Sequence, residues 1–185
     1  GVKSMLINMK NIIIIFTCIS ISLLCISCNK SQVVRPDMDA QNECEDVLKY
    51  LENKDTKKLK EMFCEVIKTS QTLNLDNEIN SAMDFFEGNI ISYDRPLLNN
   101  GSTIKYGEYT SYDIGPSIDN IKTDSNQVYN IKFYSYIINN DYPNKIGISQ
   151  IDISSKNGEK YSIGDFYLVN PKNNNWVHQR VVQRL

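Results

Sequence analysis

Downstream of an apolar leader, hydrophobic positions recur every three or four residues, the period of a helix that buries one face. The pattern predicts three helices. The first begins at Asp39 or Gln41, the second takes Asp55 as its N-cap, and the third takes Asp76. The buried stripes are, in order, Cys44, Val47, Leu48 and Leu51; Leu59, Met62, Phe63, Val66 and Ile67; and Ile79, Met83 and Phe86. Gly88 ends the third helix, because glycine accepts the left-handed conformation of a C′ residue.

After Gly88 the hydrophobic period changes to two, which is typical of β-strands. The predicted strands are residues 89–94, 102–114, 117–123, 128–138, 146–154, 161–169 and 175–182, separated by turn clusters such as 99–101, 139–141, 157–158 and 171–175. In the clearest strand Tyr129, Ile131, Phe133 and Ile137 share one face, while Asn130, Lys132, Tyr134 and Tyr136 share a semi-polar one. The apolar parity switches between Ile148 and Ile151, which predicts a β-bulge or a strong bend.

Helices first and antiparallel strands afterwards indicate an α+β fold, with N-terminal helices packed on one face of a curved antiparallel sheet. The chain of 185 residues is long enough for one such domain, expected over residues 38–185, preceded by a leader.

The leader has the pattern of a secretory signal. Lys3 and Lys10 precede an apolar run that is shorter than the ~20 residues of a comfortable membrane span. The run ends in a serine and Cys28, followed at once by polar residues. This resembles a bacterial lipoprotein signal, in which the cysteine thiol takes a diacylglycerol and becomes the mature N-terminus. We expect a signal peptide over residues 1–27, a lipid on Cys28 and a tether over residues 28–37, which place the domain on the extracytoplasmic face of the cell membrane.

Cys25 and Cys28 also allow other interpretations. A zinc site needs about four ligands, and the sequence has no second cysteine pair or histidine nearby. A C-x-x-C redox motif belongs between a strand and a helix, not in an apolar leader. A retained signal anchor is the serious alternative, and it places the domain on the same side of the membrane. Cys25 itself stands where the lipoprotein pattern usually has leucine, and its small apolar side chain suits that position.

The order of residues 51–63, 79–94 and 144–153 resembles an uncharacterised lipoprotein family of low-GC Gram-positive bacteria, called domain of unknown function 5104. The resemblance covers roughly residues 38–155. It implies a fold similar to nuclear transport factor 2 and cystatin, in which helices close a curved sheet into a cone. It implies no activity for any residue.

The candidates for chemistry are few. His178 is the single histidine, on the same strand face as Trp176, and without an identifiable partner it fits a surface role better than catalysis. Cys44 and Cys64 fit small buried hydrophobes better than nucleophiles. If the first two helices fold back antiparallel, these cysteines face each other, and a disulfide becomes a further possibility. We name no catalytic residue and expect no metal or cofactor, because calcium-loop, phosphate-loop and nucleophile-elbow spacings are missing from the sequence.

A tyrosine-lined surface is the remaining clue. Tyrosine is favoured in strands, so stabilisation is the first explanation. Rigid amphipathic rings in a concavity nevertheless suit a peptide, a glycan or a small apolar ligand. The candidate binding surface comprises Tyr106, Tyr134 and Tyr136, together with Trp176 and His178.

The favoured hypothesis is a lipid-anchored, non-enzymatic binding or protein-interaction domain. One alternative is an enzyme whose cone pocket takes a small apolar or cell-wall-derived molecule, and another is an envelope partner such as an immunity or assembly factor. A net charge of −2 argues against nucleic acid. A buried carboxylate or His178 beside a pocket of about 300 Å³ or more would favour the enzyme. A filled interior with an exposed apolar patch would favour docking.

Overall fold

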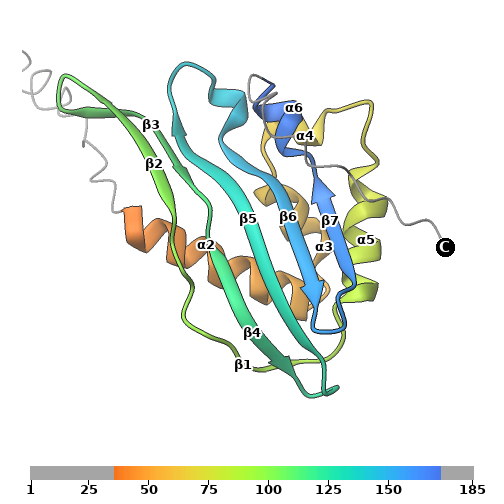
Figure 1. The fold of residues 1–185 in the computed structure, drawn as a ribbon. Coiled ribbons are helices and arrows are strands. Elements are labelled where there is room, and N and C mark those ends of the chain that lie inside the picture. Colours follow the sequence, from red (N-terminus) through yellow and green to blue (C-terminus); the bar gives the residue numbers. More distant parts are fainter. Residues whose placement is uncertain (1–35, 172–185) are drawn as a thin grey trace, which may run out of the picture. The chain divides into compact units, whose positions relative to one another are not determined.

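In the computed structural model, which describes residues 36–171, helices cover one face of a curved antiparallel sheet (Figure 1). The fold is therefore α+β, as the residue pattern predicts. The helices are α2 (Pro36–Glu52), α3 (Thr56–Met62), α4 (Glu65–Lys68), α5 (Leu75–Phe85), η1 (Pro143–Lys145) and α6 (Phe166–Val169). The strands are β1 (Ile90–Ser92), β2 (Asn100–Lys105), β3 (Glu108–Ile114), β4 (Ser117–Thr123), β5 (Val128–Asn139), β6 (Gly147–Ser155) and β7 (Lys160–Gly164).

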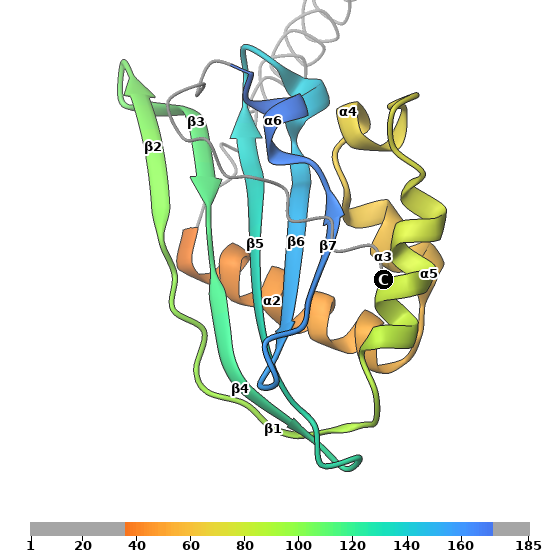
Figure 2. The same ribbon diagram turned by 45° about the vertical axis from the view of Figure 1, so that its right-hand side comes forward.

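The long strand β5 organises the sheet. On one side it pairs with β6, which in turn pairs with β7. On its other side the first half of β5 pairs with β4 and the second half with β3; β4 carries β1 and β3 carries β2. In the described chain β7 forms one edge of the sheet, and β1 and β2 form the other. Figures 1 and 2 show α2 crossing one face, with α3 and α5 beside it.

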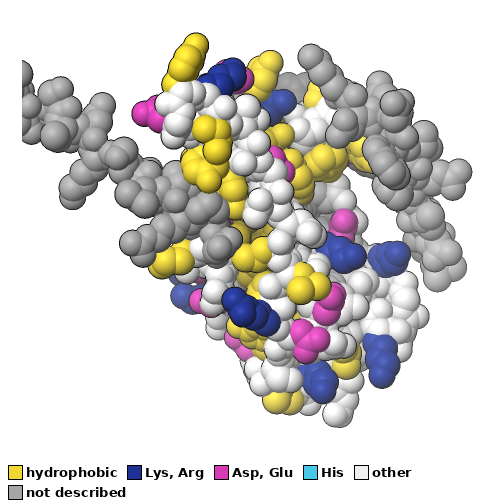
Figure 3. All heavy atoms as spheres, turned by 60° about the vertical axis from the view of Figure 1, so that its left-hand side comes forward, with side chains coloured by type: hydrophobic (Ala, Val, Ile, Leu, Met, Phe, Trp, Pro, Cys, Tyr) yellow, Lys and Arg dark blue, Asp and Glu magenta, His cyan; other side chains and the backbone are white. Residues whose placement is uncertain are grey.

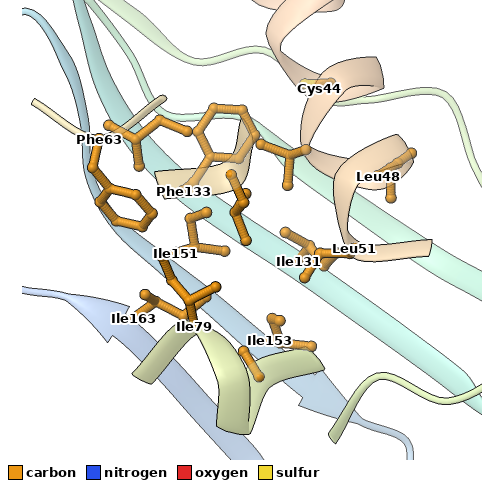
Figure 4. Close-up of a cluster of buried hydrophobic side chains, with 14 of the residues drawn as sticks. Cys44, Leu48, Leu51, Phe63, Ile79, Ile131, Phe133, Ile151, Ile153 and Ile163 are labelled. Atoms are coloured by element: carbon orange, nitrogen blue, oxygen red, sulfur yellow. The ribbon is translucent and has the colours of Figure 1, made fainter. Parts of the chain in front are cut away.

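Isoleucines of the strands fill the space beneath the helices. Ile131 and Phe133 of β5 and Ile151 and Ile153 of β6 point toward the helices, where α2 contributes Leu51. Figure 4 shows these side chains converging with those of α5 and β7. The β-bulge predicted from the parity switch between Ile148 and Ile151 is confirmed, because the β5–β6 register shifts between Tyr134 and Ser135.

The predicted second helix is in fact two. The backbone leaves the helix at Phe63, where it forms a parallel bridge with Ile148, and the amide of Cys64 donates to the carbonyl of Ile148 at 2.9 Å. A hydrogen bond to the sheet thus replaces the next helical bond. Asp55 caps α3 as predicted, accepting from the amide of Lys58 at 3.1 Å. The cap of α5 is Asn74, not Asp76 as predicted.

Lys54, in the tight connection before α3, has a positive φ of 54°. Its ammonium group donates to the carbonyl oxygens of Met83 and Phe86 at the end of α5. One side chain therefore links two helix termini and satisfies carbonyls that have no helical partner.

Two strand predictions and one turn prediction need correction. Residues 102–114 form a hairpin with its turn at Tyr106 and Gly107, and the predicted turn 99–101 instead belongs largely to β2. Residues 161–169 bend at Gly164 into α6, whose N-cap Asp165 accepts from the amide of Tyr167 at 2.9 Å. The predicted strand 175–182 lies outside the described residues.

Candidate functional site

A half-buried carboxyl group lies at the boundary of the packed interior. Glu43, one residue before Cys44 on α2, accepts a hydrogen bond of 2.8 Å through Oε1 from the hydroxyl of Ser135. Ser135 is fully buried, and its partners in the neighbouring strands, Ile114 and Ile148, are fully buried as well. Oε2 of Glu43 is buried and has no hydrogen-bond partner among the described residues. The helix thus holds a carboxyl group against an apolar wall with a single polar contact.

This environment raises the pKa of Glu43 from 4.5 to about 7. Desolvation by burial is the largest cause, and the charges of Asp39 and Asp46 add to it, while the hydrogen bond from Ser135 opposes it. The raised pKa keeps this carboxyl group protonated at a higher pH than an exposed glutamate. It therefore has the acid–base character that catalytic carboxyl groups need.

Catalysis also needs a route by which a substrate reaches the carboxyl group. One hollow of about 400 Å³ is lined by Gln41, Arg95, Pro96, Leu97 and Leu98. A second, of about 430 Å³, is lined by Glu65, Val66, Thr69, Ser70, Asn144 and Leu168. Glu43 lines neither. Within residues 36–171 no group of three or more His, Cys, Asp or Glu side chains could hold a metal ion.

The described tyrosines of the candidate binding surface lie in two separate places. Tyr134 and Tyr136 lie together, with ring centroids 5.5 Å apart, but α6 covers them: Phe166 stands 4.7 Å from Tyr134. Burial and hydrogen bonding with Tyr136 raise the pKa of the Tyr134 hydroxyl. Tyr106 does not join them, because it stands at the tip of the β2–β3 turn, fully exposed. Trp176 and His178 lie outside the described residues.

Cys44 and Cys64 are both free and buried in this structure. Burial raises the pKa of Cys44 to about 12 and raises that of Cys64 as well, so both thiols stay protonated at neutral pH. They pack in the core with the apolar residues around them.

An open sheet edge is the feature that pattern analysis missed. Residues 90–105 run along the outer side of β4 and β3: β1 pairs with β4, Leu97 bridges Ser117, and β2 pairs with β3. No strand within residues 36–171 pairs with the outer side of this segment. All but one of the residues of β2 are exposed. The sequence pattern predicted strands over residues 89–94 and 102–114, but hydrophobic periodicity does not tell an edge strand from a central one.

Some backbone groups of this edge have no strand partner within residues 36–171. The amide of Gly115 donates to the carbonyl of Asn99 at 2.7 Å, so Asn99 faces β3. Because bonding alternates along an antiparallel strand, Gly101 and Thr103 also face β3, and the amides and carbonyls of Asn100 and Ser102 point to the open side.

Apolar side chains accompany this backbone. Ile91 is 68% exposed and Leu97 64%, and Tyr93 is also exposed. Leu97 also lines the hollow beside Gln41. Figure 3 shows hydrophobic side chains running down this side of the body. We call residues 90–103 the open edge. It combines unpaired backbone with exposed apolar surface, the combination by which a sheet receives an added strand.

The family model described as "Domain of unknown function (DUF5104)" matches residues 46–165. The chain belongs to this family. A search of the curated proteins found no match to the chain.

The DUF5104 match contains some of these features and not others. The open edge and the β2–β3 turn lie within it, whereas Glu43 lies three residues before its start. No helix within residues 36–171 has both the length and the hydropathy of a membrane span.

Proposed function

We propose that the protein is a lipid-anchored, extracytoplasmic interaction domain that binds an extended segment of a partner protein along the open edge. The observation that carries the proposal is the outward-facing backbone of Asn100 and Ser102, on the same sheet edge as the exposed side chains of Ile91 and Leu97. An added strand would pair with that backbone, and its alternate side chains would meet the apolar ones.

The packed interior supports docking over an internal ligand site. The side chains beneath α2 interdigitate (Figure 4), and the large ones among them are almost fully buried. A molecule that enters there must displace this packing. A partner strand at the edge would instead pair with the outward-facing backbone of Asn100 and Ser102 and leave this packing intact.

The anchor rests on the leader. An apolar run that ends at Cys28 and is followed by polar residues suits diacylglycerol attachment, and the diacyl group would hold the body at the cell membrane. The helices on a curved sheet also suit the cone-like fold of nuclear transport factor 2 and cystatin that the family resemblance implies. An assembly or immunity factor of the cell envelope would act through the same docking of a partner protein.

Photo-crosslinking tests the open edge. A benzophenone amino acid at Leu97 should capture a partner protein in intact cells, and the same probe at Lys160 on β7, the opposite edge, should not. Ser102→Pro removes an outward amide without breaking a bond to β3, so it should abolish capture at Leu97. Lys160→Pro is the matched control: because the amide of Ser155 donates to the carbonyl of Glu159 at 2.9 Å, Lys160 also faces outward. Equal capture at both edges, or capture that survives Ser102→Pro, would contradict the proposal.

Mass spectrometry of membrane fractions tests the anchor separately. The protein should carry a diacyl mass on Cys28, and Cys28→Ala should lose that mass. A Cys28→Ala protein that still carries it would refute this attachment site.

Acid–base catalysis by Glu43 is the second candidate function, favoured by its pKa of about 7 and its unpartnered Oε2. It requires that solutes reach the carboxyl group. A water-soluble carbodiimide at pH 6 should modify the exposed Glu61 and spare Glu43, because the Oε2 atom of Glu43 is buried. Modification of Glu43 at a rate similar to that of Glu61 would favour the enzyme.

A further inference from the structure

Exposed apolar side chains gather at one end of the sheet. The β2–β3 turn and the β5–β6 connection are neighbours there, because the amide of Asn140 donates to the carbonyl of Thr110 at 2.9 Å. Figures 1 and 2 show both connections, with α6, at this end. We call its exposed hydrophobic residues the apolar end: Ile104, Tyr106, Tyr142, Ile146 and Leu168.

Tyr106 is the residue that folding explains least. It has a φ of 54° and Gly107 a φ of 84°, so the two form a tight hairpin turn in the left-handed region. Asparagine, aspartate or glycine suits the first of these positions, because a larger side chain is strained there. Tyr106 is fully exposed, so packing within the body does not offset the strain. Strain of this kind at an exposed tip indicates a contact outside the body.

The composition of this end indicates what it contacts. Tyrosines stand on both connections, and the ammonium group of Lys145 lies 4.6 Å from the ring centroid of Tyr142. Tyrosine beside aliphatic residues and lysine is typical of protein surfaces at the boundary between lipid and water. Lys105 and Lys145 are balanced by Glu108 and Asp141 in the same two connections, so we expect apolar insertion rather than charge attraction.

We propose that the apolar end rests in the headgroup layer of the membrane that carries the lipid anchor. This inference rests on the proposed attachment at Cys28. Cys28 and Pro36 are eight residues apart, a reach of at most ~28 Å. In Figures 1 and 2 α2 begins nearer to the apolar end than it finishes, so a short tether brings this end to the lipid surface. The anchor then raises the local concentration of membrane around side chains that would bind it only weakly alone.

Environment-sensitive labels test this orientation in the complete lipidated protein, reconstituted into vesicles of phosphatidylglycerol and phosphatidylethanolamine. A nitrobenzoxadiazole label is placed on Tyr106→Cys, on Tyr142→Cys or, as control, on Asn157→Cys in the β6–β7 turn at the opposite end of the sheet. The unsubstituted protein is the blank, because Cys44 and Cys64 are buried. The labels at 106 and 142 should shift to shorter emission wavelength and be quenched by nitroxide-bearing lipid, in low and high salt alike. The label at 157 should do neither.

Each result has a separate meaning. If the protein does not sediment with the vesicles at all, the anchor proposal fails. If it sediments but the labels at 106 and 142 behave like the label at 157, the anchor stands and the apolar end is not on the membrane. Quenching that high salt abolishes would show charge attraction and would overturn apolar insertion. Tyr106→Asn, which suits the turn, should reduce quenching of the label at 142.

Discussion

Replacing Glu43 by glutamine should make the protein more stable at alkaline pH. The pKa of Glu43 is raised from 4.5 to about 7, so the folded state holds the proton more tightly than the unfolded state does. The contribution of Glu43 to the free energy of unfolding is most favourable below pH 4.5, where the carboxyl group is protonated in both states. It is lost as the pH rises through 7, where the folded state must also ionise. A difference of about 2.5 pKa units corresponds to ~3 kcal/mol, and we expect ~2 kcal/mol after relaxation around the charge. Glutamine keeps the acceptor for Ser135 and has nearly the same shape, but it never ionises.

Urea unfolding between pH 4 and pH 9 measures this effect. The free energies of unfolding of the two proteins should nearly coincide at pH 4 and diverge between pH 4.5 and pH 7, with Glu43→Gln the more stable above that range. Other carboxyl groups titrate in both proteins, so they cancel in the difference. Ser135→Ala removes the one interaction that lowers the pKa of Glu43 and should make the stability of the protein that keeps Glu43 fall more steeply with pH. Parallel curves for the two proteins would refute the desolvation argument.

Further substitutions test the backbone. Lys54→Met should cost ~1–2 kcal/mol of unfolding free energy in a thermal melt, because two carbonyls at the end of α5 lose their donor, whereas the exposed Lys57→Met should cost little. Gly164→Ala should cost more than Gly158→Ala in urea unfolding: both have positive φ, but a Cβ at 164 would lie 2.4 Å from a backbone oxygen and a Cβ at 158 meets nothing within 4 Å. Tyr106→Asn should raise stability by ~1 kcal/mol, and a loss of stability would show that the ring packs on the body.

The sequence pattern predicted the elements that depend on local periodicity. The stripe of Cys44, Val47 and Leu48 lies inward on α2, and Ile131 and Phe133 lie inward on β5. The pattern predicted less well where tertiary contacts decide. The apolar residues between Leu59 and Ile67 keep helical spacing, yet the hydrogen bond from Cys64 to β6 interrupts the helix there. No local pattern in the sequence indicates this contact with the sheet.

The candidate site was the harder problem, for two physical reasons. Glu43 precedes Cys44 in a run of acidic and amide residues that resembles a solvated helix face, and only the position of Ser135, 92 residues later, shows that its carboxyl group turns inward. Tyr106 lies in a stretch with the alternation expected of a strand, but Tyr106 and Gly107 turn the chain, so the Tyr106 ring stands at the tip of the turn and not beside Tyr134 and Tyr136. Predictions that involve Trp176 and His178 stay predictions.

The open edge and the apolar end meet at Thr103 and Ile104, yet two substitutions separate their roles. Ser102→Pro removes an outward backbone donor and leaves the apolar end unchanged. Tyr106→Asn removes an aromatic ring from the apolar end and leaves the backbone of the edge unchanged. If partner docking and membrane contact are distinct functions, the first should abolish crosslinking at Leu97 without changing label quenching at 142, and the second should do the reverse. Loss of both signals in both variants would mean that one surface binds one partner, and that the membrane contact is part of that complex.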